Sequence, residues 1–547
     1  MIARILSIAA ILFSTAGGLY AQVSYERLLR AQQEPQNWLT YSGSYSSHRH
    51  SSLTQITRDN VRNLELQWVL QVRSLTGSDK FEATPLVVDG VMYTVRPPNE
   101  VVALDAVTGR IFWTYTHTPS NQARVCCGRV NRGLAILGNS LFMGTIDGRL
   151  LALSASTGEV LWNVQVAKPE SGYALTLAPL VIKDKVIVGP AGGEYGIRGF
   201  IAAYDAQTGK EVWRFNTIPG PGEPGHETWG GDSWTRGGGS IWTTGSYDPE
   251  LNLTYWGVGN PAPDWNGDSR PGDNLYTESV VALDADTGKL KWHYQFTPHD
   301  EFDYDSTQVP VLVDMPWQGK PRKLMLWANR NGFWYVLDRQ TGQFLQAKPF
   351  AKVNWADGFD EKGRPNKVLN PTAEGALVYP NNQGATNWYS PSYSPRTGFF
   401  YIPTWHDAGS VYTKDPKGVP YTEGQQYTGL FPTMPVPALV PRPTNDRLPQ
   451  EAAGAVQALD ARTGERKWEF RMSDVIDGGV LTTASDLVFS GGREGYFLAL
   501  DARNGEMLWK SMVGGQISNG PMTYAVGGRQ YVAVAAGNGL FVYALRQ

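Results

Sequence analysis

The sequence has few cysteines and few histidines, and each scarcity excludes a kind of site. Its 547 residues include two Cys, adjacent at 126 and 127, and seven His without the spacing of a zinc site. There is no C-x-x-C-H motif for covalent haem, no G-x-S-x-G nucleophile turn and no phosphate-binding P-loop. A disulfide between neighbouring residues strains the peptide that joins them, so the pair is either a local disulfide or two free thiols.

Charge of one sign and long apolar runs are also missing. The 48 Lys and Arg nearly balance the 51 Asp and Glu, which gives a net charge of −3. This balance excludes the basic surface of a nucleic-acid or anionic-membrane binder. After the N-terminus no segment approaches 18 apolar residues in a row, so we predict no membrane span in the mature chain.

Residues 1–21 have the pattern of a secretory signal peptide. Arg4 supplies the basic start, an apolar run extends from Ile5 to Phe13, and Ala21 offers a cleavage point. The alternative is an uncleaved anchor. We predict that the protein is exported and that residues 22–547 form a single domain.

Turn-forming and aromatic residues are abundant. The chain has 60 Gly, 35 Pro and 19 Trp, which favours an all-β fold. One motif, an apolar strand followed by Asp, a Thr-Gly or Asn-Gly turn and a second strand ending in Trp, recurs seven times, with Ser154 at the Asp position of the second copy. The copies span 101–113, 150–162, 201–213, 280–292, 334–346, 456–468 and 497–509, and Gln346 replaces the Trp in the fifth.

The motif predicts the blades of a β-propeller. Asp caps the turn, Gly takes a positive φ, and Trp packs on the next unit with its indole N–H on a backbone carbonyl. Most copies are 40–55 residues apart, the length of a four-stranded blade, and the interval from Gln346 to Trp468 is long enough for two. That interval contains a strand pair at 389–393 and 398–404 and a Pro-rich loop at 412–450.

Counting these strands predicts an eight-bladed propeller. Strands at 64–72, 520–525 and 529–536 are expected to share one blade, which closes the ring and removes a free sheet edge. We expect little helix, mostly near 24–33 and in loop insertions. The residues of the repeated motif join blades and carry no chemistry.

Candidate functional residues lie in irregular segments between the repeats, because a propeller binds ligands with loops at one end of its channel. Glu194 follows a Gly pair, Asn260 lies between Gly and Pro, and an acid cluster covers 300–305. Oxygen ligands from separate blades suit a hard cation. Each residue alone also fits a solvated loop.

Three local sequences together with the motif identify a family. They are Cys126-Cys127 followed by Val130-Asn131-Arg132-Gly133, GNPAP at 259–263, and DEFDYD at 300–305. The chain resembles the pyrroloquinoline quinone (PQQ)-dependent alcohol dehydrogenases over nearly its whole mature length. The resemblance implies a disulfide between Cys126 and Cys127 on one face of PQQ and Trp242 on the other.

The resemblance also implies the remaining site. Glu194, Asn260 and Asp303 would bind a metal, with Asp303 as the base that takes the alcohol proton. Arg330 would bond the quinone oxygens, and Ser240 would lie nearby. The other residues implied to line the PQQ pocket are Glu82, Arg132, Thr176, Gly192, Gly193 and Asn387.

Asp305 bears on the identity of the metal. In a strand-like segment Asp303 and Asp305 would point to one face. An acid at this place resembles the lanthanide-dependent members, since a trivalent ion is better balanced by one more carboxylate. The alternative is a Ca²⁺ enzyme in which Asp305 is a solvated loop acid.

The implied function is oxidation of a primary alcohol to an aldehyde in the periplasm, by hydride transfer to metal-bound PQQ. Electrons would pass to a separate cytochrome c. A homodimer is the oligomeric state to be tested. The same sequence features also fit a quinoprotein for sugars, polyols or polymeric alcohols, and the blade motif by itself fits a propeller scaffold without enzymatic activity.

Overall fold

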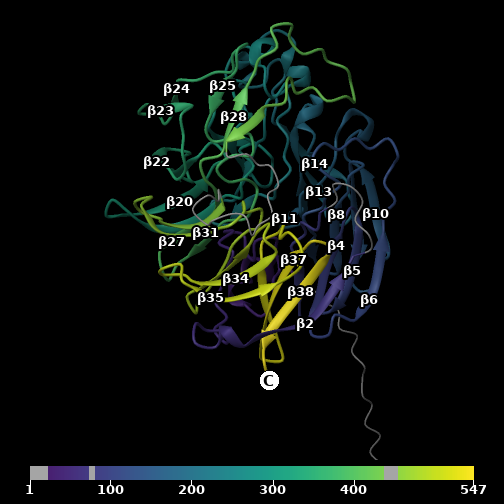
Figure 1. The fold of residues 1–547 in the computed structure, drawn as a ribbon. Helices are drawn as coiled ribbons and strands as arrows, with labels where there is room; N and C mark the ends of the chain where they lie inside the picture. Colours follow the sequence, from purple (N-terminus) through teal and green to yellow (C-terminus); the bar gives the residue numbers. More distant parts are fainter. Residues whose placement is uncertain (1–22, 73–79, 437–453) are drawn as a thin grey trace, which may run out of the picture.

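Eight four-stranded antiparallel sheets form the blades of a propeller in the computed structural model, which describes residues 23–72, 80–436 and 454–547 (Figure 1). Blade 1 consists of β3 (Leu86–Val88), β4 (Val91–Arg96), β5 (Glu100–Asp105) and β6 (Ile111–Thr116), and blade 2 of β7 (Ala135–Leu137), β8 (Ser140–Gly144), β9 (Arg149–Ser154) and β10 (Val160–Gln165). Blade 3 consists of β11 (Leu180–Ile182), β12 (Lys185–Val188), β13 (Phe200–Asp205) and β14 (Glu211–Asn216), and blade 4 of β15 (Ser246–Asp248), β16 (Leu253–Gly257), β17 (Ser279–Asp284) and β18 (Leu290–Gln295).

The second half of the chain forms the other four blades. Blade 5 consists of β19 (Val311–Trp317), β20 (Lys320–Ala328), β21 (Phe333–Asp338) and β22 (Phe344–Pro349), and blade 6 of β26 (Ser392–Ser394), β27 (Phe399–Trp405), β30 (Gly454–Asp460) and β31 (Arg466–Met472). Blade 7 consists of β32 (Leu481–Thr483), β33 (Leu487–Gly491), β34 (Tyr496–Asp501) and β35 (Met507–Met512), extended by β1 (His50–Ser51). Blade 8 consists of β36 (Met522–Val526), β37 (Arg529–Ala536), β38 (Gly539–Leu545) and β2 (Leu64–Gln71). The β2–β38 pair joins the two ends of the chain, which confirms the predicted ring closure and the eight-bladed propeller.

Helix is scarce in the described residues. The one α-helix there is α1 (Tyr25–Leu29), and η1 (Ala31–Gln33) follows it, as expected near 24–33. The 3₁₀ turns are η2 (Val61–Asn63), η3 (Pro169–Ser171), η4 (Gly193–Tyr195), η5 (His226–Thr228), η6 (Ser233–Arg236) and η7 (Gly267–Ser269). Among the described residues, no helix has the length and apolar character to cross a bilayer. The predicted signal peptide, 1–21, lies outside them.

The interval between Gln346 and Trp468 contains one blade, so the expectation of room for two there is wrong. The predicted strand pair is β26 and β27, and it completes a blade with the motif strands β30 and β31. The extra length forms two small sheets, β23 (Ala356–Phe359) with β24 (Pro365–Lys367), and β25 (Ala376–Val378) with β28 (Gly409–Tyr412) and β29 (Thr433–Val436). Figure 1 shows β23, β25 and β28 grouped in the upper part of the view.

The repeated motif joins neighbouring blades as predicted. In blade 1, the Asp105 carboxylate accepts hydrogen bonds from the Val107 and Thr108 N–H groups at 2.8 and 2.9 Å. Indole N–H groups donate to carbonyls of the following blade, at 3.2 Å from Trp113 to Ala155, 3.1 Å from Trp162 to Ala206, 3.2 Å from Trp213 to Ala285 and 3.0 Å from Trp468 to Ala502. Each contact therefore fixes one blade on the next.

The fifth blade replaces its missing Trp from another strand. Gln346 stands at the motif position, but Trp334 on β21 lies against the turn of blade 6, where a Cβ on Gly464 would be 2.9 Å from the Trp334 ring. Trp334 is fully buried. The aromatic cover of the turn is thus retained by a residue one strand earlier.

Gly158 is expected to be intolerant of a side chain. It has φ +78°, and an added Cβ would lie 2.6 Å from the Trp113 ring. Gly158→Ala should lower the thermal midpoint, at an overpacking cost of about 1–3 kcal/mol beyond the backbone strain. Gly398→Ala is the matched control, because Gly398 has φ +69° with no atom within 4 Å of its added Cβ. Equal midpoints for the two variants would contradict the inter-blade role of Trp113.

Strand direction places the candidate site at one end of the ring. Within an antiparallel blade, the second-to-third strand loop and the connection to the next blade emerge at the same end. Glu194, Asn260 and Arg330 lie in second-to-third strand loops, and Asp303 and Trp242 lie in connections between blades. The Thr-Gly turns, which join third and fourth strands, lie at the opposite end.

Candidate active site

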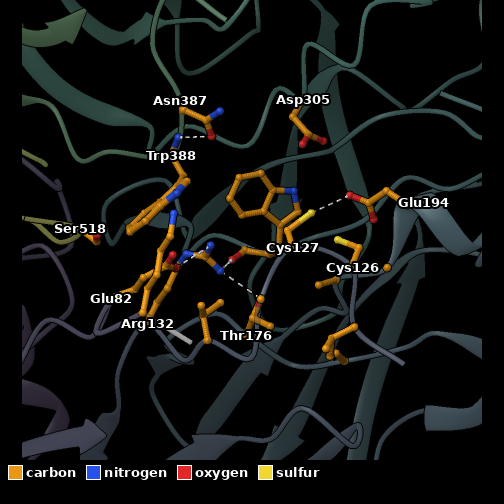
Figure 2. A pocket seen from close by; sticks show the side chains of 18 of the residues that line it. Glu82, Cys126, Cys127, Arg132, Thr176, Glu194, Asp305, Asn387, Trp388 and Ser518 are labelled. Atoms are coloured by element: carbon orange, nitrogen blue, oxygen red, sulfur yellow. Dashed lines mark hydrogen bonds and ion pairs between the residues drawn. The ribbon is translucent and has the colours of Figure 1, made fainter. Parts of the chain in front are cut away.

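A cavity of about 200 Å³ lies at the end of the ring where these loops meet. It is lined by all the predicted site residues except Gly193 and Asn260, namely Glu82, Cys126, Cys127, Arg132, Thr176, Gly192, Glu194, Trp242, Asp303, Asp305, Arg330 and Asn387. Figure 2 shows Glu82, Arg132 and Thr176 on one side of this pocket, and Cys126, Cys127 and Glu194 on another. Predicted residues up to 305 positions apart in sequence, Glu82 and Asn387, therefore share one cavity.

Asn260 and Gly193 lie directly behind the cavity wall. Asn260 is 1 % exposed, and its backbone N–H donates to Asp305 Oδ1 at 2.8 Å. Its side-chain nitrogen donates to Asp264 Oδ1 at 2.9 Å. A Cβ on Gly193 would lie 2.4 Å from Asn260 Oδ1, so the glycine lets the Glu194 loop approach this amide closely.

Asp303 and Asp305 line the cavity through a backbone conformation that the sequence did not predict. The expected strand-like geometry is wrong, because no strand covers 300–305 and Asp303 has φ +61°. Asp300 Oδ2 accepts hydrogen bonds from the N–H groups of Asp303 at 2.8 Å and Tyr304 at 3.2 Å, which holds this turn. Both acids pair with Arg330: its Nη2 lies 3.3 Å from Asp303 Oδ2, and its Nη1 lies 2.7 Å from Asp305 Oδ2.

The carboxylates lie half-buried or buried near one another, and this raises their pKa values. Burial raises the pKa of Glu194, and the charge of Asp305 adds to the rise. Burial likewise holds the pKa of Asp303 well above its usual range; Arg330 opposes the shift, whereas Asp305 and Glu194 increase it. Burial, and next the charge of Asp303, also raises the pKa of Asp264 well above its usual range. Such excess negative charge is what a multivalent cation balances.

An unsatisfied oxygen points to a missing partner. Within the described structure Asp303 Oδ1 is buried with no hydrogen-bond partner, and so is Asp264 Oδ2. Buried polar atoms are rarely left unpaired unless an ion, water or ligand binds them. The oxygen donors of Glu194, Asn260, Asp303 and Asp305 therefore fit a hard cation.

The two cysteines lie beside this oxygen-rich region. Both are free thiols in the structure, and Cys127 Sγ is 3.5 Å from Glu194 Oε1. The thiols and Glu194 form a group whose potential ligand atoms are all within 4.8 Å of one another, and Asp303 and Asp305 are not part of it. The disulfide that the resemblance implies is thus not formed here and stays a prediction.

The opposite wall is cationic and aromatic. Arg132 pairs with Glu82 at 2.9 Å and donates to Thr176 Oγ1 at 3.1 Å. Its guanidinium lies 4.8 Å from the Trp242 ring centre and 4.5 Å from that of Trp388. A guanidinium, a hydroxyl and flat rings suit a planar anionic ligand.

Several cavity residues were missed from the sequence. They include Lys80, Val130, Gln383, Trp388, Tyr389, Asp477 and Ser518. Trp388 adjoins the predicted Asn387, and Asp264 directly follows GNPAP, so position next to a motif was an available signal for both. Asp477 and Ser518 lie in connections that carry no motif, and only ring closure brings them here.

Comparison with known proteins decides the family. A model described as the β-propeller domain of glucose/ethanol/alcohol dehydrogenases, the PQQ family, matches residues 38–347. Quinohemoprotein alcohol dehydrogenase ADH IIB of Pseudomonas putida is 40 % identical over 541 residues, covering 95 % of this chain and 76 % of that protein. The chain belongs to the PQQ-dependent alcohol dehydrogenase family. This confirms the resemblance drawn from the motifs.

Further relatives agree with this membership. A quinoprotein alcohol dehydrogenase of Pseudomonas putida is 37 % identical, covering 96 % of this chain and 90 % of that one. A solved structure described as a europium-containing methanol dehydrogenase superposes with a TM-score of 0.87 at 34 % identity, covering 95 % of this chain and all of that one. A model of an outer membrane protein assembly factor also matches residues 452–546. That range covers strands of the last three blades and none of the loops that carry Glu194, Asn260 and Asp303.

Proposed function

We propose that this protein is a PQQ-dependent alcohol dehydrogenase that oxidises primary alcohols to aldehydes. The supporting observation is one cavity that joins a cationic aromatic wall at Arg132 to the half-buried acids Glu194 and Asp303 and the buried Asp305. The first side suits the carboxylates of PQQ, and the second suits a cation. A propeller scaffold has no need of this combination.

Asp303 is the proposed base. Its Oδ1 is buried without a partner, while Oδ2 faces Arg330. The unpaired oxygen can therefore accept the alcohol's hydroxyl proton, and Arg330 holds the carboxylate in place. Bound PQQ supplies the acceptor for the hydride of the alcohol carbon, and the cation supplies Lewis acidity.

The proposed metal is a lanthanide(III) ion, with Ca²⁺ as the alternative. Glu194, Asn260, Asp303 and Asp305 would hold it. Asp305 is 4 % exposed and lies in contact with both Asn260 and Arg330, so it is not a solvated loop acid. A further buried carboxylate favours the more highly charged ion. The relative described as europium-containing supports this choice.

Cys126 and Cys127 are proposed to form a disulfide that lies against PQQ, with Trp242 on the other face. Cys127→Ala should reduce turnover without lowering the thermal midpoint appreciably, because the pair joins no two blades. Steady-state rates and thermal melts of the PQQ-loaded protein test this. Wild-type rates in the variant would make the disulfide dispensable.

Electrons are proposed to leave to a separate cytochrome c, since the chain has no haem-attachment motif. The proposed compartment is the periplasm, reached through the signal peptide at 1–21. A homodimer remains a prediction, which sedimentation of the purified protein would check.

Reconstitution tests the proposal directly. The purified mature protein would be mixed with PQQ and La³⁺ or Ca²⁺, desalted, and examined by absorbance and metal analysis. We expect one bound quinone, and oxidation of ethanol and methanol with an artificial acceptor. Absence of bound quinone would favour a non-enzymatic scaffold. Preference for glucose or polyols over small alcohols would move the assignment to the related sugar and polyol enzymes.

A further inference from the structure

The Pro-rich insertion of blade 6 joins β27 to β30 as a second-to-third strand loop, so its described part, up to residue 436, lies at the same end of the ring as the candidate active site. Its part from Tyr412 to Phe431, called here the clamp segment, contacts all three loops that carry the proposed metal ligands. These loops are 192–196, 259–269 and 300–305, from different blades or connections.

The contact with loop 300–305 is an ion pair and a hydrogen bond. Lys414 Nζ lies 2.9 Å from Glu301 Oε1, and Glu301 is 2 % exposed. The Tyr412 hydroxyl donates to the Phe302 carbonyl at 3.1 Å, and the Tyr412 side chain is fully buried. The clamp segment therefore holds the backbone immediately before Asp303.

The contact with loop 259–269 uses both ends of the clamp segment. The Trp265 backbone N–H donates to the Thr428 carbonyl at 2.9 Å, and Asn266 Nδ2 donates to the Asp415 carbonyl at 3.1 Å. Lys414 Nζ also lies 2.9 Å from Asp268 Oδ1. One ammonium thus pairs with an acid of each of two metal-site loops.

The contact with loop 192–196 reaches a proposed ligand itself. The Tyr427 N–H donates to the backbone carbonyl of Glu194 at 2.6 Å. A Cβ on Gly196 would lie 3.0 Å from the rings of both Tyr421 and Tyr427. The clamp segment therefore also holds the Glu194 loop in position.

We propose that the clamp segment sets the spacing of the three proposed metal-binding loops. Lys414 is the positioning residue that reinforces the link between the Asp303 and Asn260 loops, which Glu301 Oε1 also makes directly by accepting from the Gly267 backbone N–H at 2.9 Å. This inference rests on the proposed metal site. Lys414 contacts no ligand atom, so it acts through Glu301 and Asp268. Groups that orient metal ligands in this way alter metal affinity by roughly 10–100-fold when removed.

The test measures metal affinity by equilibrium dialysis of the PQQ-reconstituted protein against La³⁺, with metal analysis of the retained ion. Lys414→Met keeps the aliphatic length and removes the charge, and should raise the La³⁺ dissociation constant roughly tenfold or more. Lys414→Arg should restore most of the affinity. Lys417→Met is the matched control, since Lys417 is exposed on the same segment, and should bind as the wild type does.

The kinetic signature separates positioning from general loss of structure. Turnover of Lys414→Met should approach the wild-type rate at saturating La³⁺, with an unchanged thermal midpoint. If Lys414→Met fails to fold, Tyr412→Phe tests the same idea, because it removes only the hydroxyl bond to Phe302 and should cost about fivefold in affinity. Wild-type affinity in the folded variant would overturn the clamp alone. Failure of the wild type to retain PQQ or La³⁺ would instead overturn the proposed function and the clamp with it.

Discussion

Asp303→Asn should bind PQQ and metal and yet lose turnover by roughly 10²–10⁴-fold, the range that general-base catalysis contributes. Asparagine has the size of aspartate and can still accept from Arg330, which is 3.3 Å from the wild-type carboxylate. It cannot accept the alcohol proton. Absorbance of the bound quinone and steady-state rates with ethanol measure the two properties separately.

The control for this variant is Asp59→Asn, which removes an exposed carboxylate outside the cavity and should leave the rate unchanged. A rate for Asp303→Asn within about threefold of the wild type, with PQQ bound, would remove Asp303 as the base. Loss of PQQ binding would instead assign the residue to holding the cofactor site together.

Asp305→Ala should abolish turnover supported by La³⁺ and leave Ca²⁺ binding weak but detectable. The variant removes a buried charge whose two oxygens contact the Asn260 N–H and Arg330. Without it, Arg330 lies near the cation site with less negative charge to offset it, so the trivalent ion loses more binding energy than the divalent one. We expect a loss of La³⁺ affinity of at least roughly 100-fold, the upper range for residues that only orient ligands.

Asp305→Asn distinguishes charge from shape in this prediction. Its amide oxygen keeps an acceptor for the Asn260 N–H, but the carboxylate charge is gone. We expect the same collapse of La³⁺ dependence in rates measured across La³⁺ and Ca²⁺ titrations. If either variant kept full La³⁺-supported activity, the role of Asp305 in metal choice would be refuted.

Local sequence predicted the blades well because each blade is a local structure. The Asp-turn-Gly-Trp pattern fixes a hairpin within about 13 residues, and the indole bonds between neighbouring blades followed as expected. The same logic failed at Gln346, where Trp334 covers the next turn from another strand. Which aromatic fills a contact depends on how blades pack, and the motif does not encode that.

The acid loop shows the same limit at the site. Its composition pointed to a cation, but the assumption of a strand was wrong because Asp300 holds Asp303 at φ +61°. A side chain that accepts from the backbone competes with strand pairing. Both acids still face the cavity, through the turn and Arg330 and not through an alternating strand.

The sequence by itself determined the all-β class, the blade repeat and the family, since each depends on short recurring or contiguous segments. It also predicted the closure of the ring, because strands at both ends of the chain were left over after the seven motif copies. Only the tertiary structure decided that loops from separate blades meet, that Trp388 and Asp264 join them, and that the Tyr412–Phe431 segment contacts the three loops that carry Glu194, Asn260 and Asp303. The physical reason is that a repeat specifies contacts between neighbours, whereas the meeting of distant loops at one end follows from the antiparallel course of every blade around a closed ring.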